Sequence, residues 1–293
     1  MYESVRELVS AAENRKKPLS ELIIAMECHD SGVSRDKVWQ RMQVNLQTMR
    51  QAIKHGESGK GAYSPTGLTG GEAIKIKKYR QSGKSLAGDA MMAAVENAIA
   101  TNEVNAAMGV VCATPTAGSS GTLPGTLFML EKRLNLTEEQ MIRFLFTAGG
   151  FGLIIANHAG IAGATGGCQE EVGSASAMAA AAAVEAAGGT PEQSSQALAI
   201  ALSNLLGLVC DPIAGLVEIP CVKRNAIGAG NALIAADLAL AGCVSKIPAD
   251  ECIMALDRVG RSMPTELRET GIGGLAGTPT GQAIKTRIFG KPI

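Results

Sequence analysis

The chain has 293 residues with 27 basic and 27 acidic side chains, so its formal net charge is zero. This balance argues against a nucleic-acid-binding protein, which usually carries a basic face. Hydrophobic residues make up 46% of the chain but aromatic residues only 3%, and such an alanine-rich composition favours packed helices over a β-sandwich.

The first part of the chain predicts helices with clear boundaries. The N-terminal stretch MYESVRELVSAAENRKK is amphipathic and lacks the apolar segment of a signal peptide. A helix is expected from Pro18 to Gly32, because proline is tolerated in a first helical turn and glycine often ends a helix. A longer helix is expected from an N-cap at Ser34 to a closing glycine at Gly56.

Four irregular segments, rich in glycine, interrupt this helical pattern. They cover residues 56–71, 108–125, 157–173 and 210–225. Glycine-rich loops between packed helices are places where backbone amides can face a ligand. The four segments are therefore the candidate positions for a binding site.

Helices are predicted between and after these segments. Further helices are expected at about 72–80, 84–101, 174–187 and 248–262. Thr137 and Gln140 have the spacing of a capping box, as do Thr190 and Gln193 around Pro191.

The longest apolar stretch, residues 226–244, is expected to be a buried helix. Asp237 lies in its interior, and a central aspartate costs about 2.5–3.5 kcal/mol on membrane-insertion scales. The β-like runs at 109–113 and 152–156 are short. The sequence therefore predicts an all-α fold, a single domain covering residues 1–293, no membrane partner and a cytoplasmic location.

The seven cysteines divide into two groups. Their odd number in a chain of this length does not predict a disulfide framework. Those in apolar or helical patterns, expected to pack as small hydrophobic residues, are Cys28, Cys112, Cys243 and Cys252. Cys168, Cys210 and Cys221 lie in the irregular segments. Three thiolates without a fourth argue against a closed structural zinc site, which leaves packing, a nucleophile or an open iron–sulfur cluster.

Other polar residues in these segments also have two interpretations. The hydroxyl-rich stretches SPTGLTGG (64–71) and TPTAGSSGT (114–122) could hold a carboxylate or phosphate, or form ordinary turns. His158 could be an acid or base, or a hydrogen-bonded loop histidine. Glu170 and Glu171 could include a base, a residue supporting a ligand, or merely solvated side chains. No Ser-His-Asp order and no phosphate-binding loop is present.

Three blocks of the sequence resemble a known family. NAAMGVVCATPTAGSSGTLPG, GATGGCQEEVGSASAMAAAAAVEAAGG and LGLVCDPIAGLVEIPCVKRN are similar to the α chain of the iron–sulfur-dependent L-serine dehydratases, and the similarity runs through nearly all of the chain. The resemblance implies that Cys168, Cys210 and Cys221 bind a 4Fe-4S cluster. It also implies conversion of L-serine to pyruvate and ammonia, with an open iron acting as a Lewis acid.

The resemblance also implies roles for the polar residues. The hydroxyl-rich stretches would hold the carboxylate and ammonium of serine, and their candidate residues are Thr116, Ser119, Ser120 and Thr122, with Ser64, Thr66 and Thr69 behind them. Arg224 and Asn225 would support the cluster or contact the carboxylate. His158 and Glu171 are the candidate bases.

Two differences from single-chain members of the family matter. Those members carry an additional N-terminal region, so the resemblance is to the α chain of a two-chain form and implies a β chain as partner. Some of them end in a cysteine that can occupy the open iron, whereas no cysteine follows Cys252 here. Two alternatives stay open: a cluster-dependent lyase acting on another amino acid such as cysteine, and a non-catalytic cluster-binding subunit.

Overall fold

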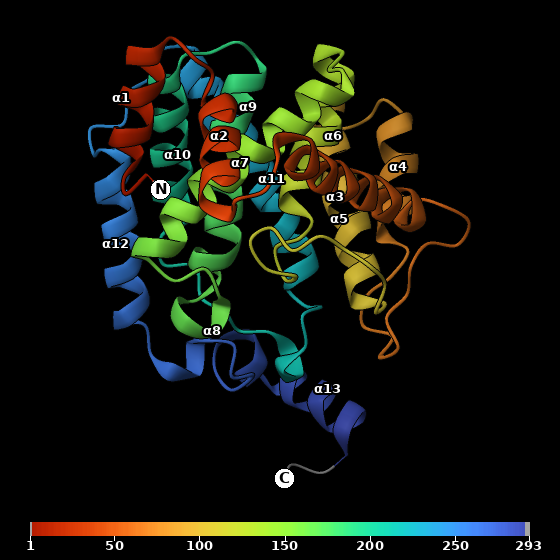
Figure 1. Cartoon of the computed structure of the whole chain (residues 1–293). Coiled ribbons are helices and arrows are strands. Elements are labelled where there is room, and N and C mark those ends of the chain that lie inside the picture. Colours follow the sequence, from red (N-terminus) through yellow and green to blue (C-terminus); the bar gives the residue numbers. More distant parts are fainter. Residues whose placement is uncertain (1, 291–293) are drawn as a thin grey trace.

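The structure, a computed structural model, describes residues 2–290 and is built from helices (Figure 1). The α-helices are α1 (Val5–Arg15), α2 (Leu19–Ser31), α3 (Arg35–Gly56), α4 (Glu72–Gln81), α5 (Gly88–Ala106), α6 (Thr122–Leu134), α7 (Glu138–His158), α8 (Gly163–Gly166), α9 (Ser174–Ala186), α10 (Pro191–Leu205), α11 (Cys221–Leu240), α12 (Ala249–Ser262) and α13 (Pro279–Phe289). Residues 2–290 contain no β-strand, only two isolated bridges. The all-α prediction is confirmed.

Several helix boundaries follow directly from local sequence. Thr137 and Gln140 form a capping box at the start of α7, and Thr190 and Gln193 form another at the start of α10. In each box the threonine hydroxyl accepts from a backbone N–H, while the glutamine side chain accepts from the threonine N–H. Ser34 is the N-cap residue of α3, as predicted, although its side chain makes no capping hydrogen bond.

The two short β-like runs form no strand, in agreement with the all-α prediction: 152–156 lies inside α7, and 109–113 has no regular structure. Some expected boundaries differ from the structure. The expected irregular segments are shorter than predicted, because α6 already begins at Thr122 and α11 at Cys221. Segment 157–173 contains α8 and a π-helical turn, η1 (Gln169–Gly173), and α13 follows the predicted helices.

The core is assembled around α9, whose residues 174–184 are all buried and mostly alanine. This helix packs against α6, α7, α10 and α11, which its short side chains allow at close range. By length and composition α7 could cross a membrane, but most of its apolar window is buried inside the protein, as expected for a core helix. The expected helix at 226–244 is α11, which is also largely buried.

The α3–α5 contact requires a glycine at the end of α3. A Cβ at Gly56 would lie 2.4 Å from the carbonyl oxygen of Ala100. Because backbone atoms cannot rotate away, we expect Gly56→Ala to lower the free energy of unfolding by about 1–3 kcal/mol. Gly149→Ala on α7 is the control, since a Cβ there meets no atom within 4 Å. Urea unfolding measures both, and equal stability of the two variants would contradict this account.

Candidate metal centre

Three cysteine side chains from distant parts of the sequence are buried next to one another. Cys168 precedes η1, Cys210 lies in the irregular chain after α10, and Cys221 is the first residue of α11. Their exposed fractions are 1%, 1% and 5%, and none forms a disulfide. Sγ of Cys168, Sγ of Cys210 and a carboxylate oxygen of Glu171 all lie within 4.8 Å of one another. The structure therefore places a donor set suited to a metal in the protein interior.

The thiols influence one another's ionisation. A hydrogen bond with Cys210, assisted by the nearby Arg224 guanidinium, lowers the pKa of Cys168 despite its burial. The same contact with Cys168, together with burial, raises the pKa of Cys210. Burial, followed by the charge of Cys168, raises the pKa of Cys221. Cys168 is thus the thiol that ionises first, and a cation would be needed to hold all three as thiolates.

Arg224 on α11 ties two of the cysteine-bearing segments together. Its Nη1 donates to Cys168 Sγ at 3.4 Å and to the carbonyl oxygen of Val209 at 2.7 Å. Its Nη2 lies 2.8 Å from Oδ1 of Asp211, and both side chains are largely buried. The guanidinium therefore supplies positive charge beside the thiols and fixes the chain on either side of Cys210.

Residues 267–275, here called the strap, close over Cys210. The Cys210 N–H donates to the Leu267 carbonyl at 2.8 Å, and the Glu269 N–H donates to the Cys210 carbonyl at 2.7 Å. Oδ2 of Asp211 accepts from the Leu275 N–H at 2.7 Å. The backbone around Cys210 is therefore held by a segment more than fifty residues later in the chain.

Glu171 is oriented by the hydroxyl-rich stretch 114–122. Thr116 Oγ1 donates to Glu171 Oε1, and Thr116 Oγ1 lies 3.2 Å from Ser119 Oγ, which donates to the Thr114 carbonyl at 3.0 Å. Burial raises the pKa of the Glu171 carboxyl. A Cβ at Gly118 would lie 2.4 Å from Glu171 Oε1, so glycine is needed for this close approach.

Asn225 connects the same stretch to α11. Its Oδ1 accepts from the N–H groups of Gly121 and Thr122 at 3.0 and 3.1 Å. Its Nδ2 donates to the carbonyls of Gly118 and Cys221 at 2.7 and 3.0 Å. Because the fully buried side chain is saturated by protein groups, Asn225 positions the loop and the start of α11. This geometry gives it no free polar atom for a substrate.

Ser120 and Thr122 are likewise engaged with the protein. Both are fully buried; Ser120 Oγ lies 3.5 Å from Asn102 Nδ2, and Thr122 Oγ1 donates to Asn225 Oδ1 at 3.2 Å. Thr116 and Ser119 lie nearer the cysteines through Glu171. The predicted substrate contacts of the four residues stay predictions. Ser119 is as deeply buried as Ser120 and Thr122, and Thr116 is the one that donates to Glu171 directly.

Glu218 brings the second hydroxyl-rich stretch to the cysteine-bearing chain. Its Oε1 accepts from Thr66 Oγ1 at 2.7 Å and its Oε2 from Thr69 Oγ1 at 3.0 Å. Ser64 Oγ lies 3.0 Å from Thr66 Oγ1. Glu218 lies between Cys210 and Cys221 and is buried, so stretch 64–69 anchors the connection between two of the three cysteines.

His158 occupies a different environment. It ends α7, is exposed, and its Nε2 lies 2.6 Å from the carbonyl oxygen of Glu3. It lines a surface pocket with Glu170, Asp257 and Arg261. Of the two candidate bases, Glu171 is the one that shares the donor set of the cysteines.

The other cysteines differ in their surroundings. Cys252 is buried, as expected, whereas Cys28 and Cys112 are partly buried. Cys243 is exposed, so the expectation that it packs inside the protein was wrong. It follows the C-terminal end of α11, where the chain turns over the surface.

A family model described as serine dehydratase alpha chain matches residues 13–276. The chain belongs to this family. It is 58% identical over 290 residues to a probable L-serine dehydratase, alpha chain, of Bacillus subtilis (strain 168), covering 99% of this chain and 96% of that relative. It is 43% identical over 287 residues to an L-serine dehydratase, alpha chain, of Peptoniphilus asaccharolyticus, covering 97% of each.

Longer relatives contain a region that is similar to this chain. An L-serine dehydratase of Haemophilus influenzae (strain ATCC 51907 / DSM 11121 / KW20 / Rd) is 34% identical over 280 residues, which make up 94% of this chain and 61% of that relative. The family region therefore accounts for a little more than half of such a protein.

Sequence reasoning missed three parts of the site: Asp211, Glu218 and the strap. Glu218 carried a usable signal, because it is an acidic residue within the otherwise apolar run IAGLVEIPCV, and a buried carboxylate needs a partner. Asp211 follows Cys210 directly. The strap carried no comparable signal, since its contacts with Cys210 use backbone groups that every sequence possesses.

Proposed function

We propose that this chain is the catalytic α chain of an L-serine dehydratase, which converts L-serine to pyruvate and ammonia. The observation that carries the proposal is that Sγ of Cys168, Sγ of Cys210 and a carboxylate oxygen of Glu171 lie within 4.8 Å of one another. The buried Cys221 thiol is close enough for the charge of Cys168 to raise its pKa. The names of the relatives at 58% and 43% identity support the same substrate.

The donor set fits an iron–sulfur cluster. Thiolates are the ligands that such clusters take, and Cys168, Cys210 and Cys221 would hold a 4Fe-4S cluster at three of its irons. Gly163 supports this interpretation, because a Cβ there would lie 2.7 Å from Cys210 Sγ, so the space beside the thiol is kept free of side chain. When bound, such a cluster supplies a Lewis acid at its fourth iron for the hydroxyl and carboxylate of the substrate.

The residues around the cysteines supply charge and orientation. Arg224 stabilises the Cys168 thiolate through its 3.4 Å contact. Glu171 accepts the α-proton of L-serine, and Thr116 fixes the carboxylate in position for this transfer. Thr116 and Ser119 bind the substrate's polar groups, while Ser120, Thr122 and Asn225 hold the loop that carries them. Ser64, Thr66 and Thr69 act through Glu218 on the connection from Cys210 to Cys221.

The wider setting follows from the relatives. Two of them are named as alpha chains, and the longer relatives contain additional sequence, so we propose a β chain as the partner that completes the enzyme. We also propose a cytoplasmic location, and a single domain for the chain, since the main core contains residues from Val5 to Leu256.

The test is anaerobic reconstitution of the chain with iron and sulfide, followed by addition of the β chain and L-serine. Pyruvate formation that requires iron and is lost in air is the expected result. Turnover in air with a pyridoxal absorbance band would contradict the proposal. Preference for L-cysteine in the same assay would reassign the substrate, and a cluster spectrum insensitive to any amino acid would indicate a non-catalytic subunit.

Thr116 provides a more local prediction. Thr116→Val removes the hydroxyl that donates to Glu171, so we expect kcat to fall by about 10- to 100-fold, as for the loss of a hydrogen bond to a charged group of about 1.5–3 kcal/mol. Thr116→Ser retains the hydroxyl and should keep most of the activity. Steady-state kinetics with L-serine measure both variants, and equal activity of the two would remove Thr116 from the site.

A further inference from the structure

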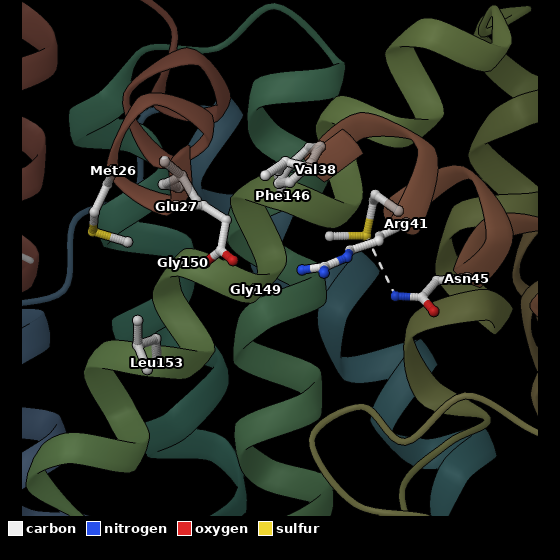
Figure 2. Close-up of a pocket in the computed structure, with 11 residues that line it drawn as sticks. Met26, Glu27, Val38, Arg41, Asn45, Phe146, Gly149, Gly150 and Leu153 are labelled. Atoms are coloured by element: carbon white, nitrogen blue, oxygen red, sulfur yellow. Dashed lines mark hydrogen bonds between the residues drawn. The ribbon is translucent and has the colours of Figure 1, made fainter. Parts of the chain in front are cut away.

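A surface pocket lies between α2, α3 and α7, which are not the elements that carry Cys168, Cys210 and Cys221 (Figure 2). Its volume is about 350 Å³, within the range of small-molecule sites. Ile23, Val38 and Phe146 provide buried apolar surface at its base, and Met26 and Leu153 add to the apolar lining. None of these residues takes part in the proposed reaction.

Opposite charges face each other across this pocket. Figure 2 shows the Glu27 carboxylate from α2 and the Arg41 guanidinium from α3 extending over the glycines of α7. Within residues 2–290 no ion pair joins either charged group to another side chain, and both are exposed. Asn45 stands one helical turn beyond Arg41 on the same face of α3 and also lines the pocket. The pocket thus offers an anionic group on one side, and a cationic group with an amide on the other.

Gly149 is an independent observation that points to the same place. It lies in the middle of α7, where glycine costs about 0.5–1 kcal/mol relative to alanine. Neighbouring glycines have a packing reason: a Cβ at Gly150 would lie 2.3 Å from Ile23, and one at Gly152 would lie 2.6 Å from Met178. A Cβ at Gly149 would meet nothing within 4 Å. Packing does not demand this glycine, and its effect is to keep the pocket open.

We propose that this pocket binds a free α-amino acid with an apolar side chain. The carboxylate pairs with Arg41 and Asn45, the ammonium pairs with Glu27, and the aliphatic side chain lies on Ile23, Val38 and Phe146. A hydroxylated side chain such as that of serine gains little from this apolar base. The pocket is therefore a ligand site distinct from the proposed substrate site.

Titration calorimetry of the full chain with L-leucine tests the proposal without iron or a partner. Saturable binding of one equivalent is expected. Isoamylamine and 4-methylpentanoate, which each lack one of the two charged groups, should bind about tenfold or more weakly, since a hydrogen bond to a charged group contributes about 1.5–3 kcal/mol. L-Serine should bind this site more weakly than L-leucine.

Three variants assign the binding to this pocket. Arg41→Ala and Glu27→Gln should each weaken L-leucine binding about tenfold or more, and Gly149→Leu should abolish it by filling the space while keeping a good helix former. Arg133 is an exposed arginine on α6, and Arg133→Ala should bind L-leucine as the unmodified chain does.

No heat of binding with L-leucine, or unchanged binding by a folded Gly149→Leu variant, would overturn the proposal. The proposal would also be overturned if the unmodified chain formed oligomers that Gly149→Leu dissociates, because the pocket would then be an interface between copies of the chain. Either failure leaves the proposed reaction untouched, since the measurement does not depend on it.

Discussion

Replacing Cys168, Cys210 or Cys221 with serine is expected to abolish cluster incorporation and, with it, pyruvate formation. Serine has nearly the same shape as cysteine, but an alcohol is far harder to ionise than a thiol and is a poor ligand for iron in a cluster. Since the three thiols are buried together, the loss of one leaves the other two unable to hold the group. The visible absorbance and iron content after anaerobic reconstitution measure the effect.

Cys243 is the matched control for these substitutions. It is exposed, so Cys243→Ser should incorporate iron and retain activity. Each protein's helical content, followed by circular dichroism, separates loss of the site from loss of the fold. If all four variants incorporated iron equally well, the assignment of the three cysteines as ligands would be wrong.

Asn225→Ala is expected to destabilise the protein by about 1–3 kcal/mol and to remove activity at the same time. The substitution leaves the buried Gly121 N–H without its acceptor, and a buried unsatisfied group costs about 1–3 kcal/mol. The Thr122 N–H loses the Asn225 contact but keeps the Ser119 carbonyl at 3.1 Å. It also removes the shorter of two hydrogen bonds to the Gly118 carbonyl, which keeps the one from Asn102 Nδ2 at 3.2 Å, next to the position where the loop approaches Glu171. Urea unfolding and kinetics with L-serine measure the two effects.

The control for Asn225 is an asparagine with no such network. Asn14 on α1 is exposed, and Asn14→Ala should change stability by no more than about 0.5 kcal/mol. Stability and activity of Asn225→Ala close to those of Asn14→Ala would show that the loop is positioned by other contacts.

The helices could be predicted where local chemistry alone decides their ends. Both capping boxes were found because each pairs two side chains three residues apart. The start of α6 was missed because Thr122, Pro124 and Gly125 resemble a turn, although proline is favourable in a first helical turn. The start of α11 was missed for a similar reason, since Pro220 and Cys221 seemed to continue a stiff loop.

The site could be predicted only as far as its residue types. Cysteines and a hydroxyl-rich stretch can be recognised in a sequence, and the family resemblance suggests a role for each. The contacts that assemble them join residues more than fifty positions apart, such as Thr116 with Glu171 and Thr66 with Glu218. Such pairs are set by the packing of α9 and α11 in the core, which local patterns do not encode.

The position of the strap in the sequence determines when the surroundings of Cys210 can be completed during synthesis. The ribosome makes Cys168, Cys210 and Cys221 before residues 267–275, yet those residues provide the backbone partners that close over Cys210. A nascent chain whose residues 267–275 have not yet left the ribosome carries the three thiols without the backbone partners of Cys210. We therefore expect iron supplied during translation to meet the three thiols without the strap, and iron supplied after chain release to meet the complete proposed site.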